Sequence, residues 1–262
     1  MTLKDKKLFL LDMDGTIYLD NDLFDGTLDF LSEVKRLGGR CLFLTNNSSK
    51  STDAYVNKLK NIGIDASEDD FLTSTDATIL YIKEKYQGRR FYSFGTASFT
   101  SQLREAGIDV VTDLCDGIEG IVMGNDNELN FKKLEDACKL LLNDIIYIAT
   151  NPDWVCPTAF GYVPDCGSVA EMLFRATGKR PYFIGKPRAD MVRLAMERYG
   201  YQPSECVMIG DRVYTDIASG FNAGIDTILV LSGEGTREDA KCDTPPTYIF
   251  DSIKDVYKVI TE

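Results

Sequence analysis

Runs of apolar residues, such as 8–11, 41–44 and 206–209, alternate along the chain with segments in which apolar residues recur at helical spacing. Continuous apolar runs are typical of parallel strands buried on both faces, and helical spacing is typical of helices that pack on one face. Gly38 and Gly63 directly follow two of the helical segments, as expected for glycines that close helices. The pattern therefore predicts an α/β fold with a mostly parallel sheet.

The predicted elements fall into three sets along the chain, of which the first and the third share one pattern. Strands are expected over 7–11, 40–44, 90–94, 110–111, 120–123, 145–149, 181–184, 205–209 and 227–231. Helices are expected over 27–37, 52–62, 76–86, 98–105, 131–143, 169–177, 189–199 and 214–221. Residues 154–167 are rich in proline, glycine and tyrosine, and we expect this stretch to be irregular.

Polar side chains follow four of the predicted strands at the point where each strand ends. They are Asp12 with Asp14, Thr45 with Asn46, Lys186, and Asp211 with Asp216 nearby. The carboxyl ends of parallel strands meet at one edge of a sheet, where open α/β folds bind ligands. We therefore expect these residues to share one cleft. Two acids at the end of a buried strand are destabilising unless they bind a metal or take part in chemistry.

Composition narrows the chemistry that such a cleft could perform. The chain of 262 residues has no histidine, which excludes Ser-His-Asp hydrolysis, histidine acid–base catalysis and His-ligated zinc. The net charge of −12 argues against nucleic acid or an anionic membrane as a partner. Seven scattered cysteines without a CxxC pair are typical of reduced thiols, so we expect a cytoplasmic protein.

Several carboxylates in one place repel one another, and a hard cation resolves the repulsion. Oxygen ligands without His or Cys favour Mg²⁺, which can also bind a phosphoryl oxygen. One carboxylate can then be a nucleophile that forms an aspartyl-phosphate, and we assign this role to Asp12. Asp14 would protonate the leaving oxygen and later take a proton from the attacking water.

The remaining strand-end residues fit around a phosphoryl group. Thr45 and the neighbouring Asn46 amide can donate hydrogen bonds to phosphoryl oxygens, and Lys186 supplies a positive charge for both the phosphate and Asp12. Asp211 would hold the metal, and Asp216 would orient Lys186 or a metal-bound water. The sequence therefore predicts a Mg²⁺-dependent phosphatase.

Four motifs together resemble those of the haloacid dehalogenase superfamily of phosphatases. They are DMDGT (12–16), LTNNSS (44–49), GKP (185–187) and GDRVYTD (210–216). The wide gap between the second and third motifs, with ATNPD at 149–153, resembles the NagD-type branch, which includes nitrophenyl, sugar and phosphoglycolate phosphatases. The resemblance covers essentially the whole chain. It implies that Mg²⁺ is held by the Asp12 side chain, the Asp14 backbone carbonyl and Asp211.

The resemblance also implies a Rossmann-like core, over 1–78 and 180–262, with a large α/β cap inserted at 79–179. Because a cap would cover the site, we expect a small phosphorylated metabolite: a sugar phosphate, a phosphoglycolate-like acid or a nucleoside monophosphate. Candidate substrate contacts in the irregular stretch are Asp153, Trp154, Tyr162 and Asp165. The sequence does not name the physiological substrate. It also leaves the oligomeric state open, although caps of this type can carry the contacts of a homodimer.

Three other interpretations start from the same residues. A phosphotransferase such as a mutase could use the same aspartyl-phosphate, and a catalytically idle binding module could share the fold. The intact set of acids with Lys186 argues against the binding module. Cys206 and Arg212 match the C-x5-R spacing of cysteine phosphatases, but Cys206 begins a predicted buried strand and Asp211 would repel phosphate. We therefore reject a cysteine nucleophile.

Overall fold

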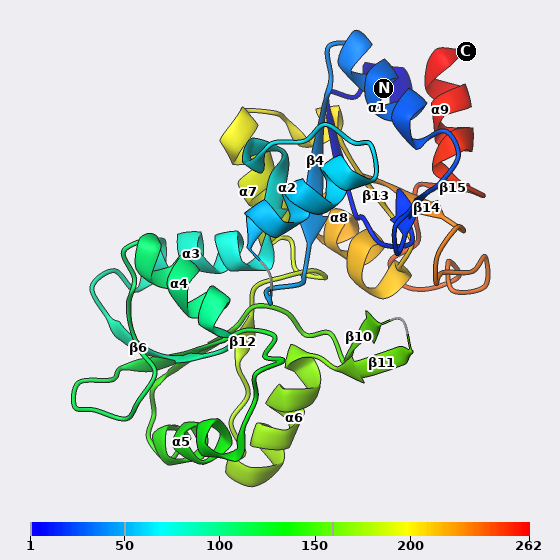
Figure 1. The fold of residues 1–262 in the computed structure, drawn as a ribbon. Coiled ribbons are helices and arrows are strands. Elements are labelled where there is room, and N and C mark those ends of the chain that lie inside the picture. Colours follow the sequence, from blue (N-terminus) through cyan, green and yellow to red (C-terminus); the bar gives the residue numbers. More distant parts are fainter. Residues whose placement is uncertain (1, 50, 159) are drawn as a thin grey trace. The chain divides into compact units, whose positions relative to one another are not determined.

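The computed structural model describes residues 2–49, 51–158 and 160–262, which form two compact units (Figure 1). The first unit comprises Met1–Thr45, Asp53–Leu72 and Lys186–Glu262, and the second comprises Asn46–Thr52 and Thr73–Gly185. The longer segment of the second unit thus runs from Thr73 to Gly185. The chain passes between the units near both ends of this long insert.

The first unit is built on a six-stranded sheet with the order β15-β14-β13-β1-β4-β5. Its strands are β1 (Leu8–Leu11), β4 (Arg40–Thr45), β5 (Phe71–Thr73), β13 (Cys206–Gly210), β14 (Asp226–Val230) and β15 (Tyr248–Phe250). β1 lies between β4 and β13 and is parallel to both, so that Leu11 is opposite Phe43 and Ile209. All four residues of β1 are buried, which explains its continuous apolar sequence.

Helices cover the sheet of the first unit. They are α1 (Thr27–Arg36), α2 (Thr52–Asn61), α7 (Asp190–Tyr199), α8 (Ala218–Ala223) and α9 (Ile253–Thr261). Three 3-10 turns (Leu3–Asp5, Glu68–Asp70 and Pro203–Glu205), one π-helical turn (Val213–Ile217) and a small hairpin of β2 (Tyr18–Leu19) and β3 (Asp22–Leu23) complete the unit. Phe30 of α1 and Val256 of α9 pack with Phe9 in one apolar core, and this packing fixes the strand that leads to Asp12.

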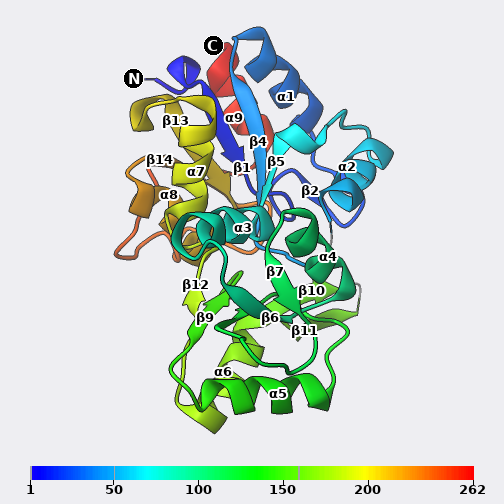
Figure 2. The same cartoon turned by 90° about the vertical axis from the view of Figure 1, so that its left-hand side faces the viewer.

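The second unit has its own parallel sheet, with the order β12-β9-β8-β6-β7 (Figure 2). Its strands are β6 (Arg90–Phe94), β7 (Asp109–Val111), β8 (Gly120–Met123), β9 (Ile146–Ala149) and β12 (Tyr182–Phe183). Its helices are α3 (Ser74–Lys85), α4 (Ala97–Glu105), α5 (Phe131–Leu141) and α6 (Cys166–Thr177). A two-stranded hairpin, β10 (Val155–Thr158) with β11 (Gly161–Pro164), precedes α6.

The α/β class and the parallel sheets are confirmed, but two local predictions are wrong. The strand expected over 181–184 is β12, and it pairs with β9 in the second sheet instead of joining the first. The stretch 154–167, of which residue 159 lies outside the described residues, is not irregular throughout, because β10 and β11 form an antiparallel ribbon there. Both strands of an isolated ribbon are edge strands, where a proline such as Pro164 interrupts no sheet.

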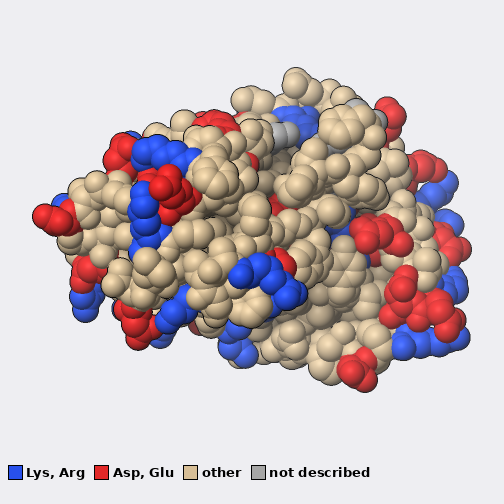
Figure 3. Space-filling model, turned by 90° about the horizontal axis from the view of Figure 1, so that it is seen from below, with Lys and Arg blue, Asp and Glu red and all other residues tan. Residues whose placement is uncertain are grey.

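The surface of the described residues carries both signs of charge. Acidic and basic side chains are interspersed on the face that Figure 3 shows, and they do not separate into regions of one sign. Among the helices that the structure describes, none has the length and the apolar character needed to cross a membrane.

Candidate active site

Asp12 stands at the carboxyl end of the central strand of the first unit. Its backbone N–H donates to the carbonyl oxygen of Ile209 at 2.9 Å, so the pairing with β13 continues one residue past β1. The side chain of Asp12 is 14% exposed. The buried strand thus holds this carboxylate at the carboxyl end of the sheet, with little freedom of orientation.

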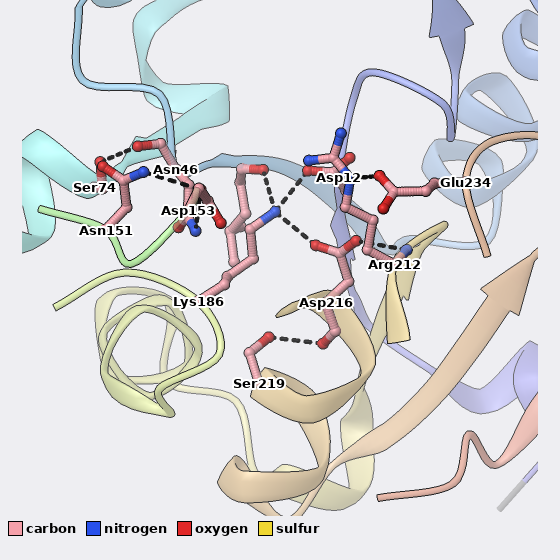
Figure 4. A network of polar contacts seen from close by, with 11 residues as sticks. Asp12, Asn46, Ser74, Asn151, Asp153, Lys186, Arg212, Asp216, Ser219 and Glu234 are labelled. Atoms are coloured by element: carbon pink, nitrogen blue, oxygen red, sulfur yellow. Dashed lines mark hydrogen bonds and ion pairs between the residues drawn. The ribbon is translucent and has the colours of Figure 1, made fainter. Parts of the chain in front are cut away.

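Lys186 is the cation of the site, and its side chain is only 3% exposed. Its Nζ lies 2.6 Å from Oδ1 of Asp12 and 2.7 Å from Oδ1 of Asp216 (Figure 4). It also donates to the carbonyl oxygen of Leu44 at 3.3 Å. Burial by itself would lower the pKa of Lys186, but the charges of Asp12 and Asp216 outweigh burial and raise it. The ammonium group is therefore held in its charged form.

Asp216 is almost completely buried, and it lies in the π-helical turn Val213–Ile217. Its Oδ2 accepts a hydrogen bond from the backbone N–H of Arg212 at 3.1 Å. Burial first, and then the charge of Asp12, raise the pKa of Asp216 to about 6, against the opposing effect of Lys186. A Cβ atom at Gly210 would lie 2.2 Å from that of Asp216, so the end of β13 needs glycine.

Asp211 follows β13 directly and is also buried. Its Oδ2 accepts a hydrogen bond from the backbone N–H of Glu234 at 2.8 Å, whereas its Oδ1 is buried with no hydrogen-bond partner among the described residues. Burial first, and then the charges of Asp12 and Asp216, raise the pKa of Asp211 to about 7. A buried oxygen of this kind is destabilising unless a donor or a cation meets it.

Carboxylate oxygens of Asp12, Asp211 and Asp216 lie within 4.8 Å of one another. Carboxylate oxygens at this spacing can serve as ligands of a hard divalent cation such as Mg²⁺. Oδ1 of Asp211, which has no hydrogen-bond partner among the described residues, is available for this role. Lys186 contacts Asp12 and Asp216 and offsets part of the negative charge. The charge of Arg212 also acts on Asp211, but it does not outweigh burial and the neighbouring carboxylates, since the pKa of Asp211 stays raised.

The side chain of Asp14 is not part of this carboxylate group. It is 44% exposed, and its Oδ2 lies 3.9 Å from Nζ of Lys58, which stands over the ring of Tyr18. Burial, opposed by the charge of Lys58, raises the pKa of Asp14. Of the three expected metal-holding residues, Asp12 and Asp211 thus come together through their side chains. Asp14 was expected to contribute only its backbone carbonyl.

Thr45 and Asn46, two of the residues expected to contact phosphate, lie at the end of β4 and directly after it. Thr45 ends β4 and is buried. Asn46 is counted with the second unit, where its Nδ2 donates to Oδ2 of Asp153 at 2.9 Å and its carbonyl oxygen accepts from Ser74 at 2.6 Å. Figure 4 draws these two contacts of Asn46.

The four expected substrate-contact residues of the second unit divide into two pairs. Asp165 is buried and caps α6 through a hydrogen bond to the N–H of Cys166, and Asp153 accepts from Asn151 and Asn46. Trp154 and Tyr162 lie at the hairpin and are 58% and 66% exposed. The two acids therefore order the unit itself, whereas the two aromatic side chains are open to solvent.

Sequence reasoning missed Arg212 and Glu234 as members of this region. Nε of Arg212 lies 2.8 Å from Oε2 of Glu234 (Figure 4). Arg212 lies inside the motif at 210–216 but was given no role, and the signal for Glu234 was a Gly-Glu-Gly segment shortly after the predicted strand 227–231. Cys206, by contrast, is buried, and burial raises its pKa to about 11. This agrees with the rejection of a cysteine nucleophile, because the thiolate is the reactive form.

Two family models match separate parts of the chain. One is described as haloacid dehalogenase-like hydrolase and matches residues 9–109, and the other is described as HAD-hydrolase-like and matches residues 183–256. The two matches contain all four motifs of the sequence, including Asp12 and Lys186. The segment between them belongs to the second unit.

Individual proteins match the chain over nearly its whole length. The chain is 36% identical over 261 residues to an acid sugar phosphatase from Staphylococcus aureus, and the match covers 99% of each protein. A crystal structure of a 4-nitrophenylphosphatase from Thermotoga maritima is 38% identical, with a TM-score of 0.93 and 98% of each chain covered. A glycerol phosphate phosphatase from Mycobacterium tuberculosis, in complex with magnesium, is 26% identical with a TM-score of 0.91, over 99% of this chain and 78% of that one.

Proposed function

Because this chain belongs to the haloacid dehalogenase-like hydrolases and is a phosphatase of their NagD-type branch, we propose that it hydrolyses small phosphomonoesters through an aspartyl-phosphate on Asp12. The observation that carries this proposal is the position of Lys186. A buried ammonium that contacts both Asp12 and Asp216 orients the nucleophile and places a positive charge where a phosphoryl group would approach it.

In the first half of the reaction, a carboxylate oxygen of Asp12 attacks phosphorus. The bond between phosphorus and the ester oxygen breaks as the Asp14 carboxyl group gives its proton to that oxygen. The raised pKa of Asp14 favours the protonated form that this step needs. The products are a free alcohol and the acyl phosphate on Asp12.

In the second half, water attacks phosphorus of the acyl phosphate, and the Asp14 carboxylate now takes the proton of that water. The bond between phosphorus and Asp12 breaks, so that inorganic phosphate leaves and both carboxyl groups return to their starting forms. Thr45 and the Asn46 amide would donate hydrogen bonds to the phosphoryl oxygens in both steps. Asp216 would keep Lys186 charged and in place.

We propose Mg²⁺ as the cofactor, held by the side chains of Asp12 and Asp211 and by the backbone carbonyl of Asp14. When bound, Mg²⁺ supplies positive charge that offsets the negative charge of the phosphoryl group. The unpartnered Oδ1 of Asp211 and the magnesium complex of the glycerol phosphate phosphatase support this assignment.

The activities for which the relatives are named, together with the proposed cap, support a substrate class. A sugar phosphatase, a 4-nitrophenylphosphatase and a glycerol phosphate phosphatase all act on small phosphomonoesters. We propose that the second unit is the inserted cap of this chain and that it restricts the substrate to a small phosphorylated metabolite, with sugar and polyol phosphates as the first candidates.

The test is a phosphate-release screen with Mg²⁺ over a panel of sugar, polyol, glycolate and nucleoside phosphates, with 4-nitrophenyl phosphate as the general substrate. Asp12→Asn should lower the rate by at least about 1000-fold, because an amide is a poor nucleophile. Asp29→Asn, an exposed acid in α1, is the matched control and should retain full activity. Activity of Asp12→Asn near that of the control would refute the aspartyl-phosphate.

A further inference from the structure

The chain directly after β14, Ser232–Gly235, contacts both loops that carry the proposed metal ligands. The hydroxyl group of Ser232 donates to the carbonyl oxygen of Gly15 at 2.8 Å. The backbone N–H groups of Glu234 and Gly235 donate to Asp211, at 2.8 Å to Oδ2 and 2.9 Å to the carbonyl oxygen. We call residues 232–235 the clasp, because they fasten the Asp12–Gly15 loop and Asp211 to the same piece of chain.

The clasp lies so close to Asp211 that two of its positions have no space for a side chain. A Cβ atom at Gly233 would lie 2.1 Å from Oδ2 of Asp211, and one at Gly235 would lie 2.2 Å from the carbonyl oxygen of Asp211. Real Cβ atoms do not come this near to other atoms, so the contact of backbone with Asp211 depends on the two glycines. Glu234 stands between them and is the residue whose N–H reaches the carboxylate.

The side chain of Glu234 ties the clasp back to the π-helical turn. Its Oε2 accepts from Nε of Arg212 at 2.8 Å, and its Oε1 accepts from the hydroxyl group of Tyr214 at 3.1 Å. The backbone N–H of Arg212 in turn donates to Oδ2 of Asp216. One carboxylate therefore connects the chain after β14 to the segment after β13 that carries Asp211 and Asp216, and its described side-chain contacts are to Arg212 and Tyr214.

We propose that Glu234 is a positioning residue for the metal ligand Asp211. Its two side-chain contacts hold the clasp in place, and the fixed N–H then binds one oxygen of Asp211 while the other remains available to a cation. Residues that orient a ligand from behind commonly change metal affinity when they are removed. The inference rests on the proposed Mg²⁺ site, but it concerns metal binding and does not depend on which ester is hydrolysed.

The experiment measures Mg²⁺ affinity without catalysis, from the rise in melting temperature of the metal-free protein as Mg²⁺ is added. Glu234→Ala removes both side-chain contacts and should weaken Mg²⁺ binding about fivefold. This value is moderate because the Arg212–Glu234 pair is partly exposed. Glu234→Gln keeps one acceptor oxygen, which can serve either Arg212 or Tyr214 but not both, and it should lose less. Glu238→Gln breaks an exposed ion pair with Lys241 in the same stretch of chain, and it should stay within twofold of the parent.

Binding of Mg²⁺ to Glu234→Ala within twofold of the parent would overturn the inference. So would a raised KM for substrate with unchanged Mg²⁺ affinity, which would make Glu234 a substrate contact instead. If Glu234→Ala does not fold, Tyr214→Phe takes its place, because it removes one of the two contacts of Glu234. We then expect Mg²⁺ affinity to fall twofold to threefold, and an unchanged affinity would contradict the inference. Mg²⁺ affinity could fall in the order parent, Glu234→Gln, Glu234→Ala while no phosphate is released from any substrate of the panel. That result would refute the proposed function but would support this inference.

Discussion

At the scale of single residues, the site is organised around the neutralisation of charge by Lys186. The ammonium group satisfies two carboxylates, Asp12 and Asp216, in a place that water hardly reaches. Breaking a buried ion pair leaves a charge without its partner and is much more destabilising than breaking a pair at the surface. Lys186 should therefore be important for stability as well as for the reaction.

Lys186→Met keeps the length and apolar stem of the side chain and removes the charge. We expect the free energy of unfolding to fall by about 3–5 kcal/mol, the typical value for a broken buried pair, and activity to fall at least about 100-fold. Urea denaturation and phosphate release measure the two effects. Lys254→Met removes the cation of an exposed pair with Asp25 and should leave activity unchanged. A fully active Lys186→Met would contradict the assigned role.

The sequence predicted which acids meet, because the rule that parallel strands end at one edge applies to β1 and β13 regardless of detail. Asp12 and Asp211 come together for this reason, whereas the π-helical turn after β13 brings Asp216 to them. The separate position of the Asp14 side chain was not predictable, since it depends on the turn after β1, where Gly15 donates its N–H to the carbonyl oxygen of Tyr18. Glu234 left almost no signal, because its contact with Asp211 is made by a backbone N–H that nearly every residue has.

At the scale of elements, the ends of β13 and β14 are shaped by close approaches of backbone to side chain. Gly210 ends β13, and the π-helical turn folds back so tightly that Asp216 lies against it. The same turn supplies the Arg212 N–H to Asp216. The short distance between strand and turn therefore sets where Asp216, and through it Lys186, can lie.

Gly210→Ala tests this packing. The added methyl group would overlap Asp216, so the turn must move, and overpacking of this kind typically lowers stability by about 1–3 kcal/mol. We expect kcat for 4-nitrophenyl phosphate to fall by at least about tenfold, because Asp216 would no longer hold Lys186. Ser204→Ala, an exposed change just before β13, serves as control. Unchanged kcat in Gly210→Ala would show that the site tolerates movement of the turn.

Most of the longer elements were predictable from local pattern, but β5, β15, α9 and the hairpin of β10 and β11 were not, and neither was sheet membership. The apolar strand β12 has the sequence of any short buried strand, and nothing in it states whether its neighbour is β9 or a strand of the first sheet. The hairpin of β10 and β11 was missed because its prolines and glycines are typical of loops, and the pairing that makes it a ribbon involves residues such as Val155 and Pro164 on separate strands. Both errors concern partners, which a local pattern does not encode.

At the scale of the whole molecule, the net charge is −12. The negative charge is concentrated where the carboxylates of Asp12, Asp211 and Asp216 lie within 4.8 Å of one another. The raised pKa values of Asp211, about 7, and Asp216, about 6, arise first from burial and then from repulsion. Both values lie above the usual value of 3.8, so between about pH 4 and pH 7 these two carboxyl groups bind more protons in the folded protein than in the unfolded chain. The stability contributed by these groups is present at low pH and is lost as pH rises through this window.

A cation should reverse this loss, because it binds the ionised carboxylates and favours the folded state. We expect Mg²⁺ to raise the melting temperature of the metal-free protein more at pH 8 than at pH 5, where protons compete for the same oxygens. Asp211→Asn, which removes one ionisable ligand, should abolish most of the shift. Without metal this variant should be more stable than the parent at pH 8, with the difference shrinking at pH 5. The melting temperature of each protein is measured at pH 5 and at pH 8, once with Mg²⁺ and once with EDTA. A Mg²⁺ shift of equal size at both pH values, or one retained in Asp211→Asn, would place the cation away from these carboxylates.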